Sequence, residues 1–139
     1  MKKNYLKLIA IAICGVMSVT ACKKDDKANN ASIVGNWGLS EFGADANTNN
    51  TLDQGEAGPV TALGLSGSLN IKADNTYAST TTFQGSTGTD DGTYTFTNNT
   101  IITTSQGVND TLFVNSVTGN RLVLKSTESE GNRWAVYTK

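Results

Sequence analysis

Residues 91–104, DGTYTFTNNTIITT, carry the clearest strand pattern in the chain. Over residues 92–97, Gly, Tyr and Phe alternate with threonine, which is the period of two expected of a half-buried β-strand. The Asn98-Asn99 pair then predicts a tight hairpin turn, because asparagine tolerates positive φ. Residues 100–104 follow as the return strand, so the stretch predicts two antiparallel strands joined by a short turn.

Similar short segments recur along the chain after Cys22, and none shows a long apolar pattern of helical period. Strands are predicted at 33–39, 69–71, 77–83, 92–97, 100–104, 111–117, 121–125 and 133–138. Turns are predicted at 73–75, 84–89, 98–99, 106–110, 118–120 and 128–132. This near-even spacing predicts an all-β fold, a small antiparallel up-and-down barrel of eight strands, whose closure removes exposed sheet edges. An open β-sandwich of the same strands is the alternative.

The inward-facing side chains of these strands are large. The predicted core is Trp37, Leu69, Ile71, Tyr77, Tyr94, Phe96, Leu122, Leu124 and Trp134, with Val136 beside Trp134 on the last strand. An eight-stranded barrel has an interior that side chains just fill, or that holds one small ligand. We therefore expect little free volume and no large hydrophobic ligand.

Residues 1–21 have the pattern of a secretion signal peptide, with a basic start and an apolar run over residues 6–19 that is too short to span a membrane. The run ends in Val-Thr-Ala-Cys22, which resembles the bacterial lipoprotein box. That resemblance implies that Cys22 receives a diacylglycerol and becomes the first residue of the mature chain. Two or three acyl chains hold a protein firmly on a membrane. An ordinary signal peptide followed by an incidental cysteine is the alternative.

Residues 22–31 are polar and lack apolar periodicity, so they predict a lipidated cysteine followed by a flexible tether. The triplet Lys24-Asp25-Asp26 resembles the export signal that sends some Gram-negative lipoproteins to the outer face of the outer membrane. We expect a lipid-anchored outer-membrane protein at the cell surface, with the periplasmic face as the alternative. Residues 32–139 then form one domain, which we expect to be monomeric.

Charge and composition exclude several functions. The whole chain has a net charge of −1, but residues 31–139 contain five Lys or Arg and ten Asp or Glu, a balance of −5. That charge disfavours nucleic acid as a partner. The chain has no histidine, which excludes Ser-His-Asp and Cys-His catalysis and most zinc sites. Asp90 and Asp91 are adjacent carboxylates just before a predicted strand and point to opposite faces, so they make a poor acid–base pair. We expect a protein that is not an enzyme.

The segment 43–65 is longer than the other connections, and long loops in compact domains are usually functional or disordered. Its residues 45–56, DANTNNTLDQGE, fit the spacing of a twelve-residue calcium loop. The oxygen ligands would come from Asp45, Asn47, Asn49, Thr51, Asp53 and Glu56, with Thr51 offering its carbonyl. Asn50 stands where such loops have glycine, and the flanks do not look helical. The segment therefore predicts a calcium loop without EF-hand helices, and a plain solvated loop is the alternative.

Several short motifs resemble one known family. Gly35-Asn36-Trp37 matches the Gly-x-Trp signature of lipocalins, and ADNTY, DGTYTF and GNRLVLK are similar to motifs in the lipocalin-like domains of small bacterial lipoproteins. The resemblance covers about residues 33–139. It implies that Trp37 plugs the closed end of the barrel, under an arginine of the last strand. Arg133 is the best candidate for that arginine and Arg121 the second.

Two functions remain open from the sequence. The first is a lipid-anchored, non-catalytic barrel that binds a small apolar ligand at its open end. The second is a surface or structural lipoprotein with a filled barrel, which meets a protein or glycan partner through its loops and is stabilised by calcium.

Overall fold

A computed structural model describes residues 32–139. Its strands are β1 (Gly35–Ala44), β2 (Ala57–Pro59), β3 (Leu65–Ile71), β4 (Thr76–Phe83), β5 (Ser86–Thr97), β6 (Thr100–Ser105), β7 (Val108–Val117), β8 (Arg121–Glu128) and β9 (Gly131–Thr138), and η3 (Val60–Leu63) is a short 3-10 helix. The predicted signal peptide, tether and lipidated Cys22 lie outside the described residues. Within residues 32–139, no helix is long and apolar enough to cross a bilayer.

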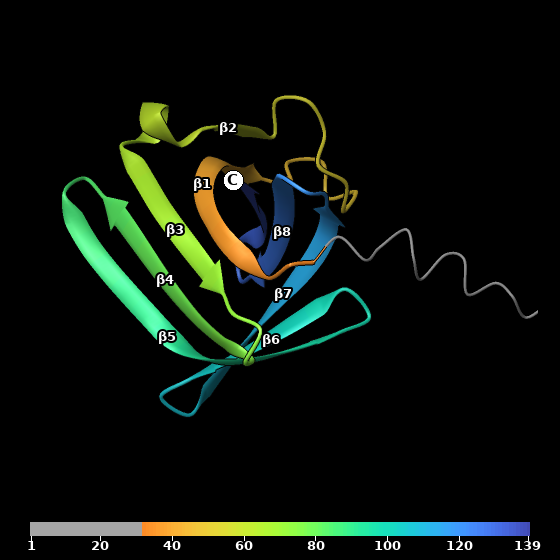
Figure 1. The fold of residues 1–139 in the computed structure, drawn as a ribbon. Helices are drawn as coiled ribbons and strands as arrows, with labels where there is room; N and C mark the ends of the chain where they lie inside the picture. The colour runs from red at the N-terminus through yellow and green to blue at the C-terminus, as the bar shows by residue number, and fades with distance from the viewer. Residues whose placement is uncertain (1–31) are drawn as a thin grey trace, which may run out of the picture. The chain divides into compact units, whose positions relative to one another are not determined.

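The strands form one closed antiparallel barrel. From β3 to β9 each strand pairs with the next along the chain, and β1 closes the ring by pairing with β3 through Gly35–Gly38 and with β9 through Gly38–Ala44. The three-residue β2 pairs only with the second half of β1 and adds no further wall. In Figure 1, β3, β4 and β5 lie side by side along one wall. The predicted eight-stranded barrel is confirmed, and the open sandwich is wrong.

Three hairpin turns are shorter than the sequence predicts, and one of them is the predicted 128–132 turn, since β8 ends at Glu128 and β9 begins at Gly131. The segments 84–89 and 106–110 are not loops, because β5 already begins at Ser86 and β7 at Val108. The turns are Gln84-Gly85, with φ of 49° and 84°, and Gln106-Gly107, with φ of 50° and 81°. Positive φ at both residues is the type I′ geometry that matches strand twist. The predicted Asn98-Asn99 turn has the same geometry, with φ of 51° and 59°.

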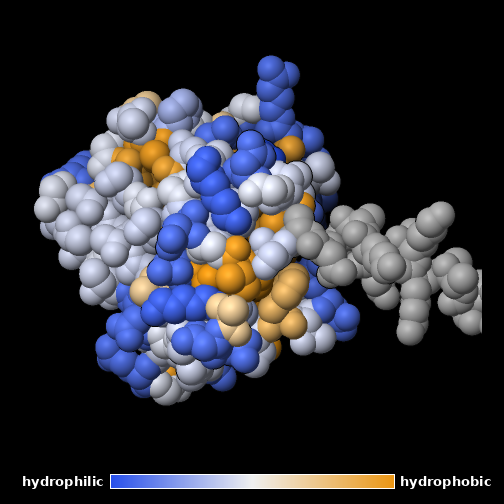
Figure 2. Space-filling model, viewed as in Figure 1, coloured by the Kyte–Doolittle hydropathy of each residue, from blue (hydrophilic) through white to orange (hydrophobic). Residues whose placement is uncertain are grey.

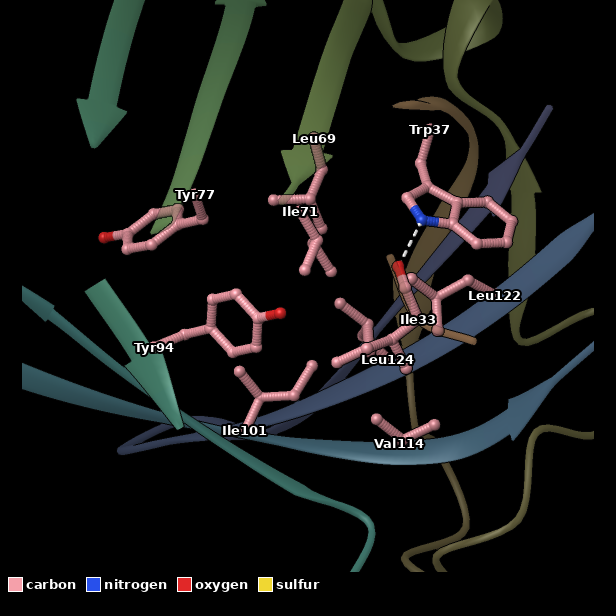
Figure 3. Packing of buried hydrophobic residues seen from close by; sticks show 10 residues of the cluster. All are labelled: Ile33, Trp37, Leu69, Ile71, Tyr77, Tyr94, Ile101, Val114, Leu122 and Leu124. Carbon is pink, nitrogen blue, oxygen red and sulfur yellow. Dashed lines mark hydrogen bonds between the residues drawn. The ribbon is translucent and has the colours of Figure 1, made fainter. Parts of the chain in front are cut away.

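The main core fills one half of the barrel, and Figure 3 shows its members packed together. They are Ile33, Trp37, Leu69, Ile71, Tyr77, Tyr94, Ile101, Val114, Leu122 and Leu124. Phe96, which the sequence places in the core, is 40% exposed. It pairs with Ile101 two residues before the Asn98-Asn99 turn. It therefore faces inward but at the rim of the barrel, where little covers its ring.

Trp134 and Val136 are buried on the outer face of the barrel, and not on the inner face that the sequence predicts. Both are fully buried and pack with Val123 against Leu52 and Ala57 of the 43–65 segment. Val123 pairs with Val136, whereas its inward neighbour Leu122 pairs with Tyr137. β9 is thus covered on both faces, so alternation alone does not reveal which face is inner.

The 43–65 segment is partly regular and lies across this outer face. It comprises the end of β1, a loop over residues 45–56, the short β2 and η3. Gly43 permits this path, because a Cβ there would lie 1.7 Å from the Glu56 carbonyl oxygen. The Ala44 amide donates to the same carbonyl at 3.1 Å. The loop therefore covers the apolar face formed by Trp134 and its neighbours.

Candidate functional site

The barrel interior holds a pocket of about 850 Å³. The predicted lack of free volume is therefore wrong. The large inward residues gather at the end where β1 begins, whereas small residues such as Ser79, Thr103 and Ser126 occupy inward positions nearer the other end. Because small side chains leave space inside the wall, the half of the barrel near the Gln84-Gly85 and Gln106-Gly107 turns stays open.

The inward residues that line the pocket fall into an apolar and a polar zone. The apolar zone, next to the core, comprises Leu69, Ile71, Tyr77, Tyr94, Ile101, Leu112 and Tyr137. The polar zone, which we call the mouth, comprises Ser79, Asp90, Thr103, Asp110, Ser126 and Glu128. Cross-strand pairing places these mouth residues on the same face, since Ser79 pairs with Asp90 and Thr103 with Asp110. The pocket is therefore amphipathic along its length.

A hydrogen bond links the two zones. The Tyr77 hydroxyl donates to Asp90 Oδ2, and hydrogen bonds from Ser105 and Tyr77 hold the pKa of Asp90 below its ordinary value. Burial, and then the Asp90 carboxylate, raise the pKa of Tyr77. The Tyr94 hydroxyl donates to the Lys72 carbonyl at 2.8 Å. At neutral pH the mouth thus carries a charged Asp90, and the tyrosines below it are neutral.

Trp37 closes the other end of the barrel, as the resemblance implies. It is 1% exposed, and its indole Nε1 donates to the Ile33 carbonyl at 2.7 Å, drawn as a dashed line in Figure 3. The cation over its ring is Lys139, whose Nζ lies 4.0 Å from the ring centroid. A Cβ on Gly35, whose φ is +150°, would lie 2.7 Å from Lys139 Cε. Glycine at this position therefore leaves room for the lysine.

Neither arginine that the sequence offers for this role has it in the structure. Arg133 Nη2 binds Glu130 Oε2 at 3.2 Å, and Arg121 borders a separate outer cleft with Glu41 and Asp53. Lys139 supplies the cation instead, and it lies just after β9 and not within it.

Asp45 anchors the loop in which the sequence predicts a calcium site. This carboxylate is 5% exposed. Its Oδ1 accepts from the Asn49 amide at 3.1 Å, and its Oδ2 accepts from the Asn50 amide and from Asn132 Nδ2, both at 3.0 Å. The Asn132 side chain, followed by the backbone amides, lowers the pKa of Asp45. Asp45 therefore fastens the loop to the start of β9.

The other predicted ligands form a second group in the same loop. Asp53 Oδ2 accepts from Asn47 Nδ2 at 2.8 Å and Asn49 Nδ2 at 2.7 Å. Glu56 accepts from the Ala46 and Asp53 amides, and the Thr51 amide donates to Asn49 Oδ1. Across residues 32–139, no three acidic, cysteine or histidine side chains are grouped so as to hold a metal ion. Calcium binding by this loop stays a prediction.

The fold and site define a class: a small closed antiparallel barrel with a tryptophan plug at one end and a pocket at the other. The family model of the lipocalin-like domain matches residues 33–124. The chain belongs to this family.

A solved structure has the same fold. A lipocalin-like protein from Bacteroides uniformis is similar with a TM-score of 0.51 at 15% identity, covering 77% of this chain and 97% of its own. An uncharacterized protein from Bacteroides eggerthii has a TM-score of 0.49 at 12% identity, covering 78% of this chain and 100% of its own. No curated protein sequence matches this chain.

Proposed function

We propose that this protein is a non-catalytic, lipid-anchored cell-envelope protein whose barrel binds a small ligand. The observation that carries the proposal is the interior pocket of about 850 Å³, since ligand sites typically measure about 300–1,000 Å³. An apolar floor and a few polar groups at the mouth are also typical of such sites.

Two features support a non-catalytic role. The chain has no histidine, and hydrogen bonds lower the pKa of Asp90, so this carboxylate is far from the pKa that suits a general acid or base near neutral pH. The tyrosine hydroxyls of Tyr77 and Tyr94 are engaged with Asp90 and with a backbone carbonyl. The pocket is thus equipped to hold a molecule.

The alternative is a surface lipoprotein with a filled barrel that meets a protein or glycan through its loops. The open pocket favours the binding protein, because a filled barrel would need large side chains where Ser79, Thr103 and Ser126 stand. Figure 2 shows a mostly hydrophilic face with small, separate apolar areas. That face offers no broad apolar surface to a protein partner.

The anchoring part of the proposal rests on the sequence. An acyl lipid on Cys22 would hold the protein on the outer membrane, at the cell surface. We further propose that the protein is a monomer.

Ligand binding is tested with the purified protein, the neutral dye N-phenyl-1-naphthylamine and native mass spectrometry. We expect dye fluorescence to rise on binding, and a co-purified small molecule at one per protein would support the proposal further. Ser79→Phe, which places a ring inside the pocket, should weaken dye binding by about tenfold. Thr80→Phe is the matched control, because Thr80 is the next residue of β4 and faces outward. Absence of both dye binding and a co-purified molecule would remove the binding function.

A further inference from the structure

We propose that the pocket takes an amphiphilic cation, a molecule with an apolar body and an amine or quaternary ammonium head. The inference rests on the proposed ligand-binding function and adds to it the charge and polarity of the ligand.

The first observation is the one-sided charge of the mouth. Three of the residues lining the pocket are acidic, Asp90, Asp110 and Glu128, and none of the lining residues is Lys or Arg. Arg133 is the basic residue that pairing places beside the mouth, opposite Ser126, but its guanidinium binds Glu130 outside the pocket. A ligand at the mouth therefore meets negative charge without a built-in counter-charge.

The second observation is how these carboxylates are arranged. They stand on three strands, β5, β7 and β8, and within residues 32–139 they do not form a group compact enough for a metal ion. A hard metal ion needs 6–8 oxygens at close range. A dispersed negative rim instead suits the singly charged head of an organic ammonium ion, which needs no closed shell of oxygen ligands.

The third observation is the aromatic floor of the pocket, which favours an apolar body beneath the charged head of the ligand. The rings of Tyr77, Tyr94 and Tyr137 line the apolar zone. The hydroxyls of Tyr77 and Tyr94 already have acceptors, and burial raises the pKa of Tyr137. The floor thus presents neutral ring faces, which accept an apolar body and attract cations through their quadrupole. The body enters first, and the head stays between the rings and the carboxylates.

The test compares three probes of equal chain length, decylammonium, decanol and decanoate, in displacement of N-phenyl-1-naphthylamine from the purified protein. Exposed charge contacts each change a binding constant only a few-fold, so the three carboxylates together should favour decylammonium over decanol by about tenfold. Decanoate should bind most weakly.

A pair of double variants separates the mouth from the general charge of the protein. Asp110→Asn with Glu128→Gln should bring the binding of decylammonium close to that of decanol and leave decanol unchanged. Asp74→Asn with Asp91→Asn removes the same charge from exposed positions that do not line the pocket, and should keep the preference. Asp90 is left intact because it holds the Tyr77 hydroxyl.

The outcomes distinguish this inference from the proposed function. If decanol and the dye bind but decylammonium binds no more tightly, the cation preference is wrong and the pocket remains a binding site. If the preference survives the Asp110 and Glu128 changes, or is lost equally in the control, the mouth does not select the ligand. If neither the dye nor any probe binds, the proposed function falls, and the cation inference falls with it.

Discussion

Trp37 and Phe96 give the same signal in the sequence, a large aromatic on the inward face of a strand, but their surroundings differ. Trp37 is 1% exposed and Phe96 is 40% exposed. Trp37→Ala should lower the free energy of unfolding by about 3–5 kcal/mol, because it leaves a cavity in the core. Phe96→Ala should cost much less. Urea unfolding of both variants checks this, and equal losses would mean that Phe96 is covered in solution.

The change of folding stability at low pH depends on three carboxylates. Hydrogen bonds lower the pKa of Asp45 through Asn132, of Asp74 through Thr76, and of Asp90 through Ser105. A carboxylate with a lowered folded-state pKa stabilises the fold above its unfolded pKa of about 3.9, and this stabilisation is lost as the pH falls through the folded value. The urea midpoint should therefore be constant near neutral pH and fall below about pH 4.

Stability at high pH depends instead on a group whose pKa is raised by folding. Burial, and then Asp90, raise the pKa of Tyr77. A group with a raised folded-state pKa stabilises the fold fully below its unfolded value, about 10 for tyrosine, and this stabilisation is lost as the pH rises through the folded value. The urea midpoint should fall above about pH 10. Tyr77→Phe should make that fall shallower, and an unchanged slope would show that folding does not raise the pKa of this phenol.

Among the elements, the 45–56 loop covers the outer face of the barrel, and calcium binding by the same loop stays a prediction. Its clear role is to cover the outer face around Trp134, fastened by Asp45 to Asn132. Calcium, if bound, would replace the Asn47 and Asn49 amide contacts on Asp53 with amide oxygens turned toward the ion.

Calcium should raise the melting temperature by binding only the folded state. At ten times Kd the stabilisation is about 1.4 kcal/mol, a shift of a few degrees. Glu56→Gln should abolish the shift, and Asp45→Asn should weaken it. Asp90→Asn is a control distant in sequence, and magnesium should act much less. A melting curve unchanged by calcium at about 10 mM would leave a solvated covering loop.

Some features of the strands were predictable from the sequence, and others were not. The eight barrel strands were predictable, because alternation marks a strand with one buried face, whereas the short β2 was not. Strand length at Ser86 and Val108 was not, because glutamine in the first place of a type I′ turn lacks the usual Asn or Gly signal. The face of Trp134 was not predictable either, since β9 is covered on both faces. The pocket was not predictable from the large inward residues alone, because small inward residues such as Ser79 and Ser126 leave room beside them.

For the protein as a whole, the proposed location depends on one group, the Cys22 thiol. Cys22→Ala removes the acceptor of the lipid, and the protein should leave the membrane fraction for the soluble one. Protease added to intact cells should digest the normal protein. Digestion only after the outer membrane is broken would place the domain on the periplasmic face instead.

The closed end of the barrel has one more consequence. β1 begins there, and Lys139 lies there too, with its ammonium over Trp37 and its amide bound to the Asn120 carbonyl. Trp37 is buried at this end, opposite the mouth. A molecule held in the pocket would therefore leave by the mouth through which it entered, and the part that went in last would come out first.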